Sequence, residues 1–319
     1  MSRLLSTLRK MQDTGKWPPT LATEVSEKAL DEPDLTELNG QATELVLDEL
    51  ALPDSGSQEV QREQVQREKR RTENLKAFDE NRPIHECVLT SHKFDPVAAE
   101  QYRKLYVEIS QAKRTSELQT LLITSALAAE GKSISALNLA ITSAAHEDQH
   151  GVLLIDADLR KPALHNYLGI RPECGLTDYL LGDVEYSRIF CKTRIPGLMI
   201  IAAGRRTSDP TALLASTRME QFIRDVKSQK QYSYIILDTS PVLLTSEPKS
   251  LLQYVDTSIL VVHAKKTPAA VVSQAIKILG EENILGCLLN GVTSSDLPFY
   301  HYSYNADYYH TDPNPAQLA

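Results

Sequence analysis

The chain of 319 residues has few cysteines, and none of them is arranged as a cross-link or a metal centre would require. Its four cysteines include no Cys-x-x-Cys pair and have no clustered histidines beside them; they are Cys87, Cys174, Cys191 and Cys287. Disulfide frameworks belong to small secreted chains with closely spaced cysteines, and zinc sites need paired ligands. The sequence therefore indicates neither, and we expect reduced thiols.

Long apolar runs are also missing from the sequence. No run approaches the roughly 18 to 20 apolar residues that a membrane-spanning helix needs. The basic residues Arg3, Arg9 and Lys10 are not followed by an apolar core and a cleavage site, so they do not indicate a secretory signal. With 42% apolar and 24% charged residues, the composition is typical of a soluble globular protein. We therefore expect a cytoplasmic location.

An excess of positive charge is absent as well, since the formal net charge is −8 at pH 7. Residues 20–59 contain eleven acidic residues and one basic residue, Lys28, so this segment carries the negative excess and the remainder is close to neutral. Nucleic-acid binding by a basic surface is therefore unsupported. We expect residues 1–82 to be an acidic N-terminal tail, partly helical or disordered, whose helices order on a partner.

What the chain does contain is a strand, a loop of small residues and a helix in succession. The apolar residues 121–123 lead into Ala-Leu-Ala-Ala-Glu-Gly-Lys-Ser at 126–133, and a helical pattern follows directly. This matches the phosphate-binding pattern Gly-x-x-x-x-Gly-Lys-Ser/Thr, with alanine in place of the first glycine. Backbone N–H groups and the helix dipole favour an anion at such a helix start. Gly131 would let the backbone approach phosphate oxygens, Lys132 would reach the β and γ phosphates, and the Ser133 hydroxyl would bind Mg²⁺.

Two further apolar strands end in carboxylates. Residues 152–155 precede Asp156 and Asp158, and residues 234–237 precede Asp238. Alternation along a strand puts Asp156 and Asp158 on one face, at the carboxyl end where a doubly wound sheet binds ligands. A single aspartate at a strand end is usually a cap. Strand ends of this kind beside the phosphate loop, in one βαβ pattern, favour a nucleotide site.

Strand and helix patterns alternate along the rest of the chain. We expect strands at 198–202, 258–263 and 285–290, and helices at 97–113, 162–168, 176–181, 217–227 and 268–280. This alternation predicts an α/β fold with a doubly wound, mostly parallel sheet of P-loop NTPase type and helices on both faces. We place this domain at residues 83–297, followed by a tyrosine-rich C-terminal tail at 298–319.

Several further segments of the chain form a recognisable series together with the loop and the strand ends. They read EQYRKL, TSA with EGKS, LIDADLRKP, GLTDYL, DPTALL, DTSP and LNG, at 100–105, 124–126 with 130–133, 154–162, 175–180, 209–214, 238–241 and 289–291. Through these segments the chain resembles, from about residue 84 to residue 292, the bacterial tyrosine kinases (BY-kinases) of exopolysaccharide and capsule assembly. The chain departs from the family at three places, where Ala128-Ala129 replaces Pro-Gly, Tyr106 replaces an arginine and Ser240 replaces a proline. None of these removes a phosphate or metal ligand, so the resemblance implies an active ATP-dependent protein-tyrosine kinase.

The resemblance also implies roles for named residues, with ATP and Mg²⁺ as cofactors. The nucleotide would be held by Ala128, Ala129, Glu130, Gly131, Lys132, Ser133 and Ile134, with Asn290 on the adenine edge. Ser133, Asp156 and Asp238 would hold the metal, and the catalytic set would be Lys132, Asp156, Asp158 and Asp238. Asp158 is the candidate base for the tyrosine hydroxyl, although Asp156 and Asp158 could exchange roles. The basic pair Arg160 and Lys161 could attract phosphates or an acidic tyrosine tail.

Two more features acquire a meaning through the resemblance. The C-terminal cluster would be autophosphorylated in trans; it consists of Tyr300, Tyr302, Tyr304, Tyr308 and Tyr309. The helix expected at 97–113 would join subunits into an oligomer through Glu100 and Arg103, with Tyr106 at the third position of the family pattern. The cytoplasmic segment of a separate membrane co-polymerase would recruit the kinase to the inner face of the cell membrane and activate it. The family links this cycle to exopolysaccharide polymerisation and export.

Two other classes of function remain open on the sequence alone. One is a P-loop ATPase switch of the partitioning or division-site type, which carries a second lysine five positions before the loop lysine. Leu127 occupies that position here and argues against this class. The other is a nucleotide-binding scaffold without catalysis, in which the ligand residues persist for structural reasons.

Overall fold

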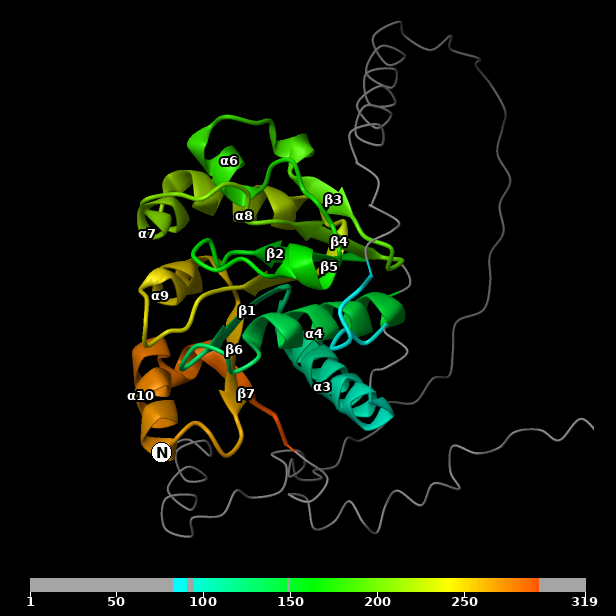
Figure 1. The fold of residues 1–319 in the computed structure, drawn as a ribbon, viewed down its shortest axis with the longest axis vertical. Helices are drawn as coiled ribbons and strands as arrows, with labels where there is room; N and C mark the ends of the chain where they lie inside the picture. The colour runs from blue at the N-terminus through cyan, green and yellow to red at the C-terminus, as the bar shows by residue number, and fades with distance from the viewer. Residues whose placement is uncertain (1–82, 91–94, 148–149, 293–319) are drawn as a thin grey trace, which may run out of the picture.

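The structure is a computed structural model that describes residues 83–90, 95–147 and 150–292 (Figure 1). A seven-stranded sheet runs through it in the order β3-β4-β2-β5-β1-β6-β7. β3 is antiparallel to β4, and every other neighbouring pair is parallel. The strands are β1 (Thr120–Ser125), β2 (Gly151–Asp156), β3 (Phe190–Lys192), β4 (Leu198–Ile201), β5 (Tyr232–Asp238), β6 (Thr257–His263) and β7 (Ile284–Asn290).

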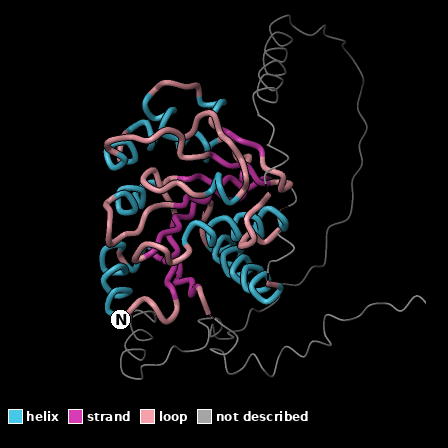
Figure 2. The backbone as a smooth tube through the Cα atoms, in the orientation of Figure 1, coloured by secondary structure: helices cyan, strands magenta, loops and turns pink. Residues whose placement is uncertain are grey.

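Helices connect these strands and cover both faces of the sheet (Figures 1 and 2). The α-helices are α3 (Pro96–Thr115), α4 (Lys132–His146), α5 (Leu164–Tyr167), α6 (Leu176–Leu181), α7 (Pro210–Leu214), α8 (Thr217–Ser228), α9 (Glu247–Leu251) and α10 (Ala269–Leu279). Three short 3-10 turns occupy Tyr186–Arg188, Leu252–Tyr254 and Glu281–Asn283. Among the described helices, none combines the length and the apolar character that crossing a bilayer requires.

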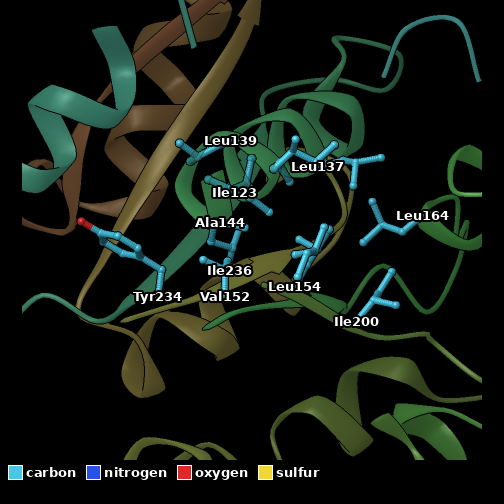
Figure 3. Packing of buried hydrophobic residues seen from close by; sticks show 14 of the residues in the cluster. Ile123, Leu137, Leu139, Ala144, Val152, Leu154, Leu164, Ile200, Tyr234 and Ile236 are labelled. Carbon is cyan, nitrogen blue, oxygen red and sulfur yellow. The ribbon is translucent and has the colours of Figure 1, made fainter. Parts of the chain in front are cut away.

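The alternation of side chains along β1 explains why the sheet is buried on both sides. Leu121 and Ile123 pack toward α4, while Leu122 packs with the opposite cluster. Figure 3 shows the first of these clusters, where Leu137 of α4 faces side chains of the central strands. The second cluster includes Phe222 of α8. Parallel strands covered on both faces in this way are typical of doubly wound folds, so the expected fold class is confirmed.

Helix α4 lies between the sheet and α3 and is buried along nearly its whole length, from Ser133 to Ala144. A helix that is apolar or small on all sides belongs in an interior. The phosphate loop is therefore attached to a rigid, fully packed element rather than to a surface helix.

The expected elements are present, with boundaries shifted by a few residues, but three short ones besides the 3-10 turns were not foreseen. They are the antiparallel edge strand β3 and the five-residue helices α7 and α9. The structure also brings the carboxyl ends of β1, β2 and β5 together, because Asp238 is paired in register with Ile123 on one side and with Asp156 on the other. The candidate site lies at this edge of the sheet.

Candidate active site

The loop between β1 and α4 has the backbone of a phosphate cradle. Gly131 is the N-cap of α4 with φ of 92°, and Ala129 also has a positive φ, of 62°. L-residues rarely adopt this left-handed region, whereas glycine does so freely. The N–H groups at the start of α4 have no helical acceptor and are available to an anion.

Hydrogen bonds of two side chains, Glu130 within the loop and Asn290 outside it, fix the conformation of this loop. Glu130 is 3% exposed, and its carboxylate accepts the backbone N–H of Leu127 at 2.7 Å and the hydroxyl of Thr267. The side-chain amide of Asn290, at the end of β7, donates to the backbone oxygen of Glu130 at 2.9 Å. Asn290 therefore contacts the loop itself. Its predicted contact with the adenine edge remains a prediction.

Lys132 lies at the centre of the acidic groups that the sequence singled out. Its ammonium nitrogen is 2.7 Å from Oδ2 of Asp158, 3.6 Å from Oδ1 of Asp238 and 3.0 Å from Oγ of Ser133. Asp156, Asp158 and Asp238 are 0%, 3% and 0% exposed, so none of them is a solvated surface carboxylate. The structure thus brings together the residues predicted to be catalytic and to bind the metal.

The buried carboxylates beside Lys132 are incompletely satisfied. Oδ2 of Asp156 accepts the backbone N–H groups of Ala163 and Leu164, at 3.1 and 3.2 Å, but Oδ1 has no hydrogen-bond partner. Neither oxygen of Asp238 has a hydrogen-bond partner, although Oδ1 forms an ion pair with Lys132 at 3.6 Å. Buried carboxylate oxygens without partners are costly, and a hard cation such as Mg²⁺ satisfies them.

This donor set fits Mg²⁺ bound together with a nucleotide rather than a metal held by protein alone. No group of three or more histidine, cysteine, aspartate or glutamate side chains in the described ranges is arranged to hold a metal ion. Mg²⁺ typically takes only one or two carboxylates and completes its shell with waters and phosphate oxygens. Asp156, Asp238 and the Ser133 hydroxyl match that requirement.

The charges in the site influence one another strongly. Burial raises the pKa of Asp156, and repulsion from Asp238 raises it further. Burial likewise raises the pKa of Asp238 to about 6, although the charge of Lys132 opposes the shift. Burial alone would lower the pKa of Lys132, but the carboxylates of Asp238 and Asp158 outweigh it, so this pKa is raised. One ammonium group therefore faces more negative charge than it can neutralise, which favours an added cation.

Asp158 differs from Asp156 in its partners. Its Oδ1 accepts the backbone N–H of Lys161 at 3.0 Å, and its Oδ2 pairs with Lys132. Asp156 is bound to the start of α5 and has one oxygen left over. This difference is the geometric basis for assigning the two residues separate roles below.

Sequence reasoning missed one buried charged residue beside the site. Glu247, the first residue of α9, is 1% exposed and pairs with Arg160 at 2.7 Å. The stretch from Ser246 to Pro248 is typical of an ordinary helix start, and nothing in it predicts burial. Only its partners, which come from distant parts of the chain, reveal it.

The candidate oligomer helix α3 shows its expected residues at the surface. Arg103 donates to Glu100 at 2.7 Å, and their side chains are 46% and 27% exposed. Tyr106 instead turns toward α4, where its hydroxyl donates to Glu147 at 3.1 Å and its ring lies 4.9 Å from that of His146. The predicted oligomer remains a prediction. The tyrosine cluster at 300–309 and the acidic tail at 1–82 lie outside the described residues.

Comparison with known proteins relates this geometry to named relatives. No protein-family model matches the chain. A putative tyrosine-protein kinase, CapB of Staphylococcus aureus, is 28% identical over 66% of this chain and 91% of its own length. The tyrosine-protein kinase YwqD of Bacillus subtilis is 32% identical over 64% of this chain and 85% of its own length.

A solved structure agrees with these sequence relatives. The kinase domain of the Escherichia coli tyrosine kinase ETK superposes with a TM-score of 0.58 and 32% identity, over 61% of this chain and 76% of that chain. The expected family and enzyme class are both confirmed by these relatives. With its phosphate loop, Lys132 and three buried aspartates in place, the chain belongs to the bacterial tyrosine-protein kinases and is a protein-tyrosine kinase.

Proposed function

We propose that this kinase transfers the γ-phosphate of Mg²⁺-bound ATP to its own C-terminal tyrosines, in trans between copies. The observation that carries the proposal is the position of Lys132 between Asp158 and Asp238, directly at the start of α4. Phosphoryl transfer asks a protein mainly to position groups and to neutralise charge. This arrangement supplies one ammonium group, two carboxylates with oxygens that lack hydrogen-bond partners, and the backbone N–H groups at the start of α4.

The chain's own residues would divide the work of binding. The backbone of residues 128–134 would bind the phosphates, and Lys132 would exchange Asp158 for the β and γ phosphate oxygens. Ser133, Asp156 and Asp238 would hold Mg²⁺, which supplies neutralisation of the phosphate charge. Asn290 would contact the adenine edge from its place behind the loop.

Asp158 is the proposed base, because the release of Lys132 would free its Oδ2 at the edge of the site. The acceptor phenol has an ordinary pKa near ~10, so proton removal needs help. The phenolic oxygen bonds to the γ-phosphorus while the bond to the β–γ bridging oxygen breaks. The phenolic proton passes to Asp158, and ADP leaves.

Phosphorylation of the tails would also control whether copies of the kinase associate or separate. Copies would associate through the exposed pair Glu100 and Arg103 on α3, each presenting its tyrosine cluster, Tyr300 to Tyr309, to a neighbour. Each phosphate adds nearly two negative charges, so repulsion between tails would loosen the oligomer. The cytoplasmic segment of a membrane polysaccharide co-polymerase would be the activating partner, with the acidic tail at 1–82 as the docking element. This cycle would regulate exopolysaccharide polymerisation and export at the inner face of the cell membrane.

The test combines purified protein with Mg²⁺ and ATP beside a Lys132→Met variant, followed by mass spectrometry of the C-terminal peptide. Phosphate on the 300–309 cluster in the unaltered protein, and none in the variant, is the expected result. Mixing Lys132→Met protein with an active copy that lacks the tail tyrosines tests transfer in trans. ATP turnover without any phosphotyrosine would instead favour an ATPase switch, and nucleotide binding without turnover would favour a scaffold.

A further inference from the structure

Glu247 is a buried acid that none of the roles above uses. It begins α9, on the connection that leaves the carboxyl end of β5. A buried carboxylate is costly unless it is paired and hydrogen-bonded, so its partners identify what it holds in place. Those partners lie in three separate segments, two of which directly follow carboxylates of the phosphate site.

The carboxylate of Glu247 joins these segments directly. Its Oε1 accepts Nε–H of Arg160 at 2.7 Å and the hydroxyl of Thr211 at 3.0 Å. Its Oε2 faces the hydroxyl of Ser240 at 3.4 Å. Burial by itself raises the pKa of Glu247, but hydrogen bonds from Thr245, Arg160 and others outweigh it and lower this pKa. The group is therefore an anion at neutral pH.

Two of these partners, Arg160 and Ser240, follow a carboxylate of the phosphate site by the same number of residues in the sequence. Arg160 follows Asp158 by two residues, and Ser240 follows Asp238 by two residues. The segment at Ser240 is fixed in turn, because the hydroxyl of Thr124 on β1 donates to its backbone oxygen at 2.8 Å. Glu247 thus connects Arg160, which follows β2, to Ser240, which follows β5 and is itself hydrogen-bonded to β1.

Among the partners of Glu247, Arg160 is the one whose side chain could also bind an anionic ligand. Its side chain remains 48% exposed although the carboxylate that it pairs with is 2% exposed. A guanidinium has five N–H donors in a fixed plane, so one bond through Nε fixes that plane and leaves donors for an anion. Planar forks of this kind bind phosphate oxygens in pairs.

We propose that Glu247 is a positioning residue for phosphoryl transfer, because it orients the Arg160 guanidinium toward the phosphoryl group as it passes to tyrosine. This inference rests on the phosphate site proposed above. Arg160 contacts the transferred group, and Glu247 acts only through Arg160. Loss of Glu247 therefore impairs the chemical step more than it impairs the binding of nucleotide.

The test compares full-length Glu247→Gln, Arg160→Gln and the double variant with a matched control, Arg224→Gln. Arg224 is also an exposed arginine paired with a glutamate, at 64% and 46% exposure on the outer side of α8. The assays measure kcat and KM for ATP with a random Glu-Tyr copolymer as acceptor, and binding of a fluorescent ATP analogue with Mg²⁺. Glu247→Asp, which keeps the charge, is the conservative variant.

We expect Glu247→Gln to lower kcat by about 100-fold, the loss typical of a displaced catalytic contact, with KM for ATP and analogue affinity nearly unchanged. The double variant should have the same kcat as Arg160→Gln alone, because Glu247 acts only through Arg160 and has no effect once Arg160 is removed. Glu247→Asp should recover part of the rate, and Arg224→Gln should match the unaltered protein.

Three results would overturn the inference. They are a Glu247→Gln kcat equal to that of Arg224→Gln, losses that multiply in the double variant, and full activity of Arg160→Gln. The activity of Arg160→Gln tests the inference even if Glu247→Gln does not fold, because Arg160 is half exposed and its replacement should leave the fold intact. Failure of the unaltered protein to bind the analogue would instead overturn the proposed phosphate site, so the two failures are distinguishable.

Discussion

The side-chain nitrogen of Asn290 lies 2.0 Å from the point where a β-carbon on Gly131 would stand. The two residues are far apart in the sequence and meet because β7 ends behind the phosphate loop. Position 131 therefore requires glycine for two reasons. Its φ is 92°, and the side chain of Asn290 already occupies the place that a β-carbon would take.

Gly131→Ala should weaken nucleotide binding by at least about tenfold and destabilise the fold by about 1 to 3 kcal/mol, because the left-handed backbone is strained for alanine. Removing the contact as well, in Gly131→Ala with Asn290→Ala, should relieve the collision but not the backbone strain. Titration with a fluorescent ATP analogue and urea unfolding measure both effects. Unchanged affinity in the single variant would show that the loop tolerates a side chain here.

Ala129→Gly should stabilise the protein. Ala129 has φ of 62°, which costs an L-residue roughly 1 to 2 kcal/mol, while glycine adds a smaller entropy cost of about 0.4 to 1 kcal/mol in the unfolded chain. The expected net gain is about 0.5 to 1 kcal/mol in urea unfolding. Ala128→Gly is the matched control, because Ala128 has no positive φ and should lose stability. A gain in both variants would contradict the strain argument.

Asp238→Asn should be inactive yet more stable than the unaltered protein above pH 6. The pKa of Asp238 is raised to about 6, so the folded state holds a proton that the unfolded state loses near its ordinary value of 3.8. The associated stability is present below pH 3.8 and is lost as pH rises through 6. The advantage of the variant, on the order of 1 to 3 kcal/mol, should therefore grow between pH 4 and pH 7.5. Urea unfolding without nucleotide across this range measures it, and a constant difference would argue against the shifted pKa.

Glu100→Ala with Arg103→Ala should disturb assembly but not folding. The pair is an exposed i, i+3 contact and is worth only about 0.2 to 0.5 kcal/mol. Sedimentation velocity should show loss of the oligomer, with the melting temperature nearly constant. The exposed pair Glu220 and Arg224 on α8, changed in the same way, is the control. Equal behaviour of the two variants would remove α3 from the interface.

The parts of the site that could be predicted are those that sequence encodes locally. Gly131, Lys132 and Ser133 follow a strand and open a helix, and apolar strands end at Asp156 and Asp238. Both signals depend on neighbouring residues alone, so the fold class and the central residues of the site followed from them.

The rest of the site depends on contacts between distant residues. The burial of Glu247 arises from Arg160 and Thr211, and the placement of Asn290 depends on the order of strands across the sheet. Helices α7 and α9 have five residues each, too few to show a period of 3.6, and β3 has three. Hydrophobic periodicity therefore does not reveal such elements, and only helix-start residues such as Asp209-Pro210 and Ser246 to Pro248 indicate where α7 and α9 begin.

The position of Asn290 also limits how far Tyr300, the first of the proposed acceptor tyrosines, can lie from the phosphate loop. Asn290 contacts the phosphate loop, and Tyr300 follows it by ten residues, so a fully extended connection reaches at most about 36 Å. On the proposed function, so short a connection would give Tyr300 a high effective concentration at the site of its own subunit. If the proposed function holds, reaction within one subunit would therefore compete with transfer between subunits. Dilution of the protein distinguishes the two routes. The specific rate of autophosphorylation stays constant for reaction within one subunit, and it falls with protein concentration for transfer between subunits.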